Sequence, residues 1–173
     1  MRVLIASPSD VAAERQVLTD VVLDWNAANS AATGMVLQPI KWETHAHPAS
    51  GDRPQAIINR QIVDDSDILI GVFWSRLGTD TGVAPSGTAE EIERLRAKGK
   101  NVLLYFSTKP LPQDHDPEQW RLLKEYQQTL QKDTLYWNFE TCDELYRVSS
   151  RHLASLIHKL TAELEDDIGP ETA

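Results

Sequence analysis

Cysteine, clustered metal ligands and long apolar runs are all scarce in this sequence. The only cysteine, Cys142, excludes an internal disulfide framework and is typical of a reducing compartment. No apolar run approaches the length of a membrane span, and the first residues lack the apolar segment of a signal peptide. The five histidines have no metal-ligand spacing, so no metal site is predicted. We therefore expect a cytoplasmic protein without a membrane contact.

Two further absences limit the possible ligands. The net charge of −9 argues against nucleic acid as a partner, because binding to phosphates requires clustered Lys and Arg. The sequence contains neither G-x-G-x-x-G nor G-x-x-x-x-G-K-S/T, so neither a standard dinucleotide-binding fold nor a P-loop is predicted. A chain of 173 residues is long enough for one domain with a sizeable core.

Strand and helix patterns alternate along the chain about five times. Short apolar runs predict buried strands at 2–6, 67–73 and 101–106, and two more strands are expected at 35–42 and 134–138. Pro39 indicates that its strand lies at an edge, since proline cannot donate to a ladder. Helical spacing follows each strand, in segments that begin near Pro8, at Pro54, at Gly87, at Glu118 and at Asp143. The sequence thus predicts one α/β domain over residues 1–165, followed by an acidic flexible tail over 166–173.

This alternation favours a flavodoxin-like, three-layer fold. We expect a five-stranded, mostly parallel sheet of order 2-1-3-4-5 with helices on both faces. In such sheets, ligands bind outside the carboxyl ends of the strands. The candidate site is therefore formed by the loops at 7–10, 43–53 and 74–88, of which the last two are longer than a connection requires.

The helix that opens at Ser86 carries two adjacent glutamates. At about 100° per residue, Glu90 is predicted to point away from the apolar face toward solvent, whereas Glu91 lies on a flank that can face the crevice. Glu91 is therefore the better candidate for a catalytic carboxylate. The alternative is that acids in this first turn only complement the helix dipole.

Other residues near the predicted crevice could bind a ligand or have a purely structural role. Ser7 and Ser9 could bind phosphate or ribose, but Ser7 could equally cap the first helix, with Asp10 as the capping-box acid. Arg76 could bind a pyrophosphate or be a solvated loop charge. Trp42 and Trp74 could stack on a base or belong to the core. Ser86 and Thr88 could bind ribose hydroxyls, or Ser86 could only cap the helix.

Three stretches resemble one known group of proteins. The segment S-G-T-A-E-E-I (86–92) resembles a motif of nucleoside deoxyribosyltransferases and of the TIR-like proteins related to them. The opening V-L-I-A-S-P-S-D-V-A-A-E-R (3–15) and the segment I-L-I-G-V-F-W-S-R-L-G (68–78) resemble the first and third strands, with their loops, of a bacterial TIR-like family. Together the three stretches cover the chain from Arg2 to about Phe106.

The resemblance implies both an activity and a catalytic residue. TIR domains include enzymes that hydrolyse or cyclise NAD, so it implies NAD as substrate, no separate cofactor, and Glu91 as the catalytic glutamate. It also implies self-association with like domains, a possible sensor domain or partner chain, and a role in antiphage defence. Two alternatives stay open: a non-catalytic TIR-type interaction module that assembles through the loop at 43–53, and a nucleoside N-glycosidase or deoxyribosyltransferase with the same crevice.

Overall fold

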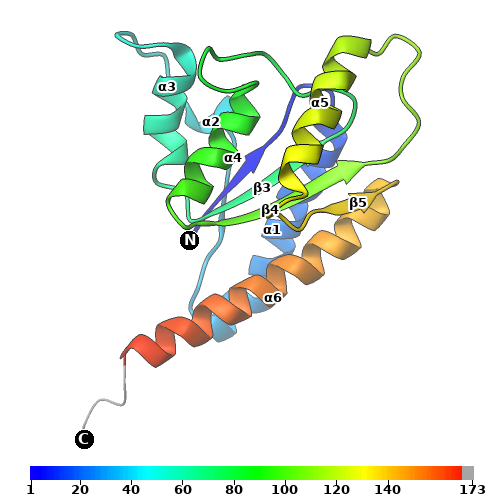
Figure 1. Cartoon of the computed structure of the whole chain (residues 1–173). Coiled ribbons are helices and arrows are strands. Elements are labelled where there is room, and N and C mark those ends of the chain that lie inside the picture. Colours follow the sequence, from blue (N-terminus) through cyan, green and yellow to red (C-terminus); the bar gives the residue numbers. More distant parts are fainter. Residues whose placement is uncertain (169–173) are drawn as a thin grey trace, which may run out of the picture.

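A parallel β-sheet forms the centre of the protein (Figure 1). The computed structural model describes residues 1–168. The order of the strands is β2-β1-β3-β4-β5, and every neighbouring pair is parallel. The predicted fold class and strand order are therefore confirmed. The strands are β1 (Arg2–Ala6), β2 (Gln38–Ile40), β3 (Ile68–Phe73), β4 (Asn101–Ser107) and β5 (Trp137–Phe139).

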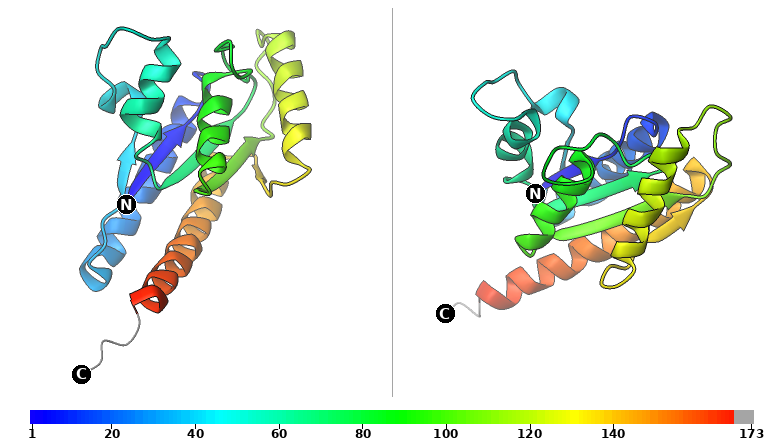
Figure 2. Two further views of the ribbon diagram at one scale, coloured as in Figure 1. Left: turned by 60° about the vertical axis from the view of Figure 1, so that its left-hand side comes forward. Right: turned by 45° about the horizontal axis from the view of Figure 1, so that its top comes forward.

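Helices cover both faces of this sheet (Figure 2). One face carries α1 (Ala12–Thr33) and α6 (Cys142–Ile168), and the opposite face carries α3 (Pro54–Ile58), α4 (Gly87–Ala97) and α5 (Pro117–Leu130). A π-helical turn, η1 (Asn59–Val63), continues α3 directly, and the single-turn helix α2 (Trp42–His45) follows β2. Side chains alternate along each strand, so Val3 and Ile5 pack toward α1 and α6 whereas Leu4 packs toward the other layer.

The second strand is shorter than its sequence pattern predicts. Pairing extends only from Gln38 to Ile40, and Trp42 begins α2 instead of ending the strand. Pro39 does lie in an edge strand, as predicted, because β2 pairs with β1 alone. The early end of β2 turns the chain outward, and Trp42 thereby lies over the carboxyl end of the sheet.

The start of the first helix also differs from the prediction. Helix α1 begins at Ala12 behind Val11, and no side chain caps it, so neither Ser7 nor Asp10 has the predicted capping role. Instead, the Asp10 carboxylate accepts hydrogen bonds from the backbone and hydroxyl of Ser75, at 2.9 and 2.8 Å. Asp10 therefore connects the loop after β1 to the loop after β3.

The C-terminal helix passes the predicted domain boundary. Helix α6 extends to Ile168, whereas the flexible tail was predicted to begin at residue 166. The rest of that predicted tail, residues 169–173, lies outside the described residues. Within 1–168, no helix is both long enough and apolar enough to span a bilayer.

Candidate functional site

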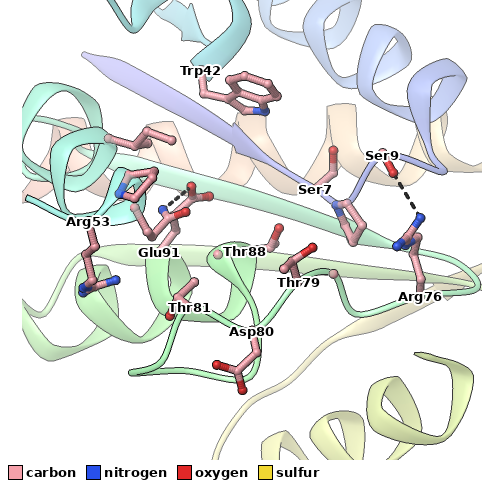
Figure 3. Close-up of a pocket in the computed structure, with 16 residues that line it drawn as sticks. Ser7, Ser9, Trp42, Arg53, Arg76, Thr79, Asp80, Thr81, Thr88 and Glu91 are labelled. Atoms are coloured by element: carbon pink, nitrogen blue, oxygen red, sulfur yellow. Dashed lines mark hydrogen bonds between the residues drawn. The ribbon is translucent and has the colours of Figure 1, made fainter. Parts of the chain in front are cut away.

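A cleft of about 500 Å³ opens at the carboxyl ends of β1 and β3 (Figure 3). The loop after β1 and helix α2 contribute to one side of it, and the loop after β3 and the first turn of α4 contribute to the other. The N-terminal half of α3 closes one end. The cleft lies where parallel α/β sheets generally bind their ligands. The predicted residues Ser7, Ser9, Trp42, Arg76, Thr88 and Glu91 all line it.

Glu91 is a carboxyl group that is almost removed from water. It is 8% exposed, and its Oε1 accepts a hydrogen bond from Gln55 Nε2 at 3.0 Å. Burial raises the pKa of Glu91 to about 7, because the charged form loses hydration, and the nearby charges of Glu90 and Glu43 act in the same direction. The hydrogen bond from Gln55 opposes this rise. A carboxyl group that titrates near neutral pH inside a cleft is typical of a functional site.

The neighbouring Glu90 does not point to solvent, so that prediction is wrong. Glu90 is 7% exposed and accepts two hydrogen bonds from the Arg53 guanidinium, at 2.8 and 2.5 Å. It also accepts hydrogen bonds from Asn59 Nδ2 at 2.7 Å and from the Thr81 hydroxyl at 2.5 Å. Arg53 provides the largest effect, and it holds the pKa of Glu90 below its usual range. The helical period identified the apolar face of α4 but could not show that Arg53, Asn59 and the loop before α4 cover this polar face.

The opposite end of the cleft contains a guanidinium group with few protein partners. Arg76 makes one long hydrogen bond, from Nη1 to Ser9 Oγ at 3.4 Å, and its buried Nε has no partner among the described residues. Ser7 lies beside this group, and its hydroxyl accepts a hydrogen bond from Arg15 Nε at 2.8 Å. Figure 3 shows Arg76 and Ser9 at one end of the cleft and Glu91 at the other.

Arg15 was not predicted as a site residue, although it belongs to the opening motif. Its guanidinium donates to Ser7 Oγ, to the carbonyl of Pro8 at 3.0 Å and to the Glu43 carboxylate. It therefore joins the loop after β1 to α2, the helix that carries Trp42. The indole of Trp42 is 51% exposed at the border of the cleft, where an aromatic ring could stack on it.

Two predicted ligand contacts lie outside the cleft. Trp74 packs against the core between the sheet, α1 and α6, and its Nε1 donates to the carbonyl of Lys109 at 3.3 Å. The Lys109 ammonium lies 3.6 Å from the centre of the Trp74 ring and pairs with buried Glu14. Ser86 is fully buried and caps α4, because its Oγ accepts the backbone N–H of Ala89 at 3.0 Å. Both residues thus have the structural role that the sequence left open.

Three polar residues around Glu91 were missed by the sequence reasoning. These are Arg53, Gln55 and Asn59, which come from the start of α3 and from η1. A usable signal existed, because Gln55 and Asn59 are four residues apart and therefore share a face of one helix. Among residues 1–168, no group of three His, Cys, Asp or Glu side chains is arranged to hold a metal ion.

The parallel sheet, its two helical layers and the cleft place the protein in the class of three-layer α/β domains with a ligand-sized cleft at the strand ends. Within this class, the chain belongs to the family described as a domain of unknown function (DUF4062), which matches residues 2–154. No curated protein matches the chain. The crystal structure of a conserved protein from Enterococcus faecalis V583 is similar in fold, with a TM-score of 0.50 at 14% identity. That similarity covers 88% of this chain and 98% of the other.

Proposed function

We propose that this protein consumes NAD by cleaving the bond between nicotinamide and ribose, with Glu91 as the catalytic carboxylate. The observation that carries the proposal is the buried Glu91 side chain in a cleft at the carboxyl ends of the strands. The resemblance of residues 3–15, 68–78 and 86–92 to TIR-like proteins supports the same residue and the same reaction.

The chemistry requires one carboxylate in the ionised form. Departure of nicotinamide leaves positive charge on the ribose, and a carboxylate beside the anomeric carbon can stabilise that cation or trap it covalently. Nicotinamide leaves as a neutral molecule because its ring nitrogen takes the bonding electron pair, so no general acid has to protonate it. Water then completes hydrolysis to ADP-ribose, whereas attack by a group of the substrate itself gives a cyclic product.

The environment of Glu91 favours a cationic substrate over a neutral nucleoside. Burial makes the negative charge of Glu91 costly, and the pKa of about 7 reflects that cost. A pyridinium ring bound nearby offsets the cost, because an opposite charge at close range stabilises the carboxylate. Binding of oxidised NAD therefore promotes ionisation of Glu91, which a neutral nucleoside does not do.

The other end of the cleft supports a substrate that contains a diphosphate. A guanidinium donates to phosphate oxygens in a planar, two-pronged geometry, and the only protein partner of Arg76 among residues 1–168 is the Ser9 hydroxyl, 3.4 Å from Nη1. A nucleoside has no phosphate to accept hydrogen bonds from this guanidinium. For this reason the nucleoside N-glycosidase or deoxyribosyltransferase is the weaker alternative.

The non-catalytic interaction module remains the competing proposal. Trp42 is half exposed beside the segment at 46–53, so an assembly contact on this side of the domain would cover an apolar surface. Self-association and catalysis are also compatible, and the resemblance implies both. We accordingly propose that concentrated or assembled protein is the active form.

The decisive experiment measures nicotinamide release. Purified protein over a wide range of concentrations is incubated with NAD, and nicotinamide, ADP-ribose and cyclic products are separated by chromatography. Wild type should release nicotinamide and Glu91→Gln should not. The matched control is Glu93→Gln, which removes an exposed carboxylate of the same helix and should keep full activity. Absence of nicotinamide at every concentration, including under crowding, would reject catalysis in favour of the interaction module.

A further inference from the structure

A relay of two side-chain amides connects Glu91 to Glu90. Gln55 Nε2 lies 3.0 Å from Glu91 Oε1 and 3.2 Å from Asn59 Oδ1, and Asn59 Nδ2 donates to Glu90 Oε1 at 2.7 Å. Both neighbours of Gln55 Nε2 are oxygen acceptors, so only one orientation of the Gln55 amide satisfies them. The NH₂ group of Gln55 is therefore directed at the carboxylate of Glu91.

The backbone of α4 restricts the other half of the same amide. A Cβ atom on Gly87 would lie 2.4 Å from Gln55 Oε1 and 3.2 Å from Gln55 Cδ. The amide thus packs directly on the first residue of α4, in space that any larger residue at position 87 would occupy. The Gln55 amide is therefore packed between Gly87 on one side and Asn59 on the other.

Gln55 is also the only group within residues 1–168 that donates a hydrogen bond to the Glu91 carboxylate. The charged groups that act on Glu91 are the carboxylates of Glu90 and Glu43, which oppose its ionisation. Each of these two acids has its own cation, since Arg53 donates both hydrogen bonds to Glu90 and Arg15 pairs with Glu43, and neither guanidinium donates to Glu91. Without Gln55, a buried carboxylate would lack any donor and would face two like charges.

We propose that Gln55 is a positioning residue that holds the Glu91 carboxylate in its reactive orientation and in its ionised form, an inference that rests on the proposed function. The residue does not touch the reacting atoms in this proposal. It acts through one charge-assisted hydrogen bond, and Gly87 provides the room for it.

The test uses two substitutions with opposite effects. Gln55→Leu keeps the approximate side-chain volume but removes the hydrogen-bond donor. The value of kcat should therefore fall about tenfold to a hundredfold, and the acid limb of the pH profile of kcat should move to higher pH. Gln55→Lys provides an ammonium donor, so the acid limb should move to lower pH. KM should change little in both variants. If Gln55 had a purely structural role, the two substitutions would not shift the acid limb of the pH profile in opposite directions.

A third variant disrupts the hydrogen bond between Gln55 and Glu91 without changing Gln55 itself. In Gly87→Ala, the new methyl group displaces the flexible end of Gln55, which costs little stability, yet kcat should fall as it does in Gln55→Leu. The matched control is Gln61→Leu. This substitution removes a side-chain amide of the same helical segment, but one that bonds to the His47 backbone at an exposed position. Its pH profile should equal that of wild type.

An independent readout follows the Glu91 carboxyl group itself. Titration of protein labelled with ¹³C at the glutamate carboxyl, with Glu91→Gln for assignment, should give a higher pKa for Glu91 in Gln55→Leu and a lower one in Gln55→Lys. If wild type cleaves NAD but Gln55→Leu changes neither kcat nor this titration, the role of Gln55 is refuted. If folded wild type releases no nicotinamide, the proposed function fails instead, whatever the titration shows.

Discussion

Replacing Glu91 with glutamine should stabilise the folded protein at pH 8 while it abolishes turnover. The reason is the cost of burying the Glu91 charge. In the unfolded chain, this carboxyl has its ordinary pKa of 4.5, and burial raises the pKa to about 7 in the folded protein. The folded state consequently binds the proton more tightly than the unfolded state.

The sign and size of the effect follow from this difference. The protonated Glu91 gives its full contribution to stability below about pH 4.5, and that contribution is lost as the pH rises through about 7. Since each pKa unit corresponds to about 1.4 kcal/mol, ionised Glu91 costs about 3 kcal/mol of folding free energy at pH 8. Glutamine carries no charge, so Glu91→Gln avoids this cost. For a domain of this size, the gain corresponds to a rise in Tm of about 6–12 °C.

The assay is urea unfolding of wild type and Glu91→Gln at pH 5 and pH 8. The two proteins should differ little at pH 5, and the variant should be more stable at pH 8. A difference that is the same at both pH values would refute the reasoning, because it would show that burial of the Glu91 charge is not what the substitution relieves.

The neighbouring residue provides the matched control with the opposite sign. Arg53 lowers the pKa of Glu90, so the contribution of Glu90 is present above its unfolded pKa and is lost as the pH falls. Glu90→Gln weakens its charge-assisted hydrogen bonds from Arg53, Asn59 and Thr81, and should cost about 1–3 kcal/mol at pH 8. Two adjacent, equally buried glutamates should thus respond in opposite ways to the same substitution.

Three further substitutions separate binding from packing. Trp74→Ala should lower stability by roughly 2–3 kcal/mol in urea unfolding, with the KM for NAD unchanged, because the ring packs in the core. Arg76→Ala should raise the KM for NAD about tenfold and weaken ADP binding in calorimetry, without a loss of Tm, because it removes the proposed diphosphate contact. Gly71→Ala should cost about 1–3 kcal/mol, visible as a lower Tm, since the new Cβ would lie 2.7 Å from buried Leu104 Cδ2.

The fold could be predicted from the sequence because its local patterns agree with each other. The apolar run at 67–73 predicted a buried strand, which is β3 at the centre of the sheet, and Pro39 predicted an edge strand, which is β2. Alternation of strands with helices then permits few parallel topologies, because crossovers are right-handed and short. The same alternation indicated which strand ends meet, and hence the cleft that contains Ser9, Arg76 and Glu91.

The roles of individual polar residues were less predictable. Trp42 and Trp74 look alike in the sequence, since each lies at the junction between a predicted strand and a long loop. The early end of β2 brings Trp42 to the cleft, whereas β3 pairs as far as Phe73, and Trp74 packs against the core. Propensity and period do not determine where a strand stops pairing, because that depends on its partner strand.

The sequence by itself determined the order of the strands and the side of the sheet that forms the cleft, and it led to the proposal of Glu91 as the catalytic carboxylate. Only the tertiary structure decided that Glu90 is buried and ion-paired, and that Gln55 is the donor to Glu91. The physical reason is that helical periodicity describes one helix, whereas the environment of a polar side chain depends on segments distant in the chain. Here α3 and the loop after β3 pack against α4, so that burial raises the pKa of Glu91 while the hydrogen bonds from Arg53 lower that of its neighbour Glu90.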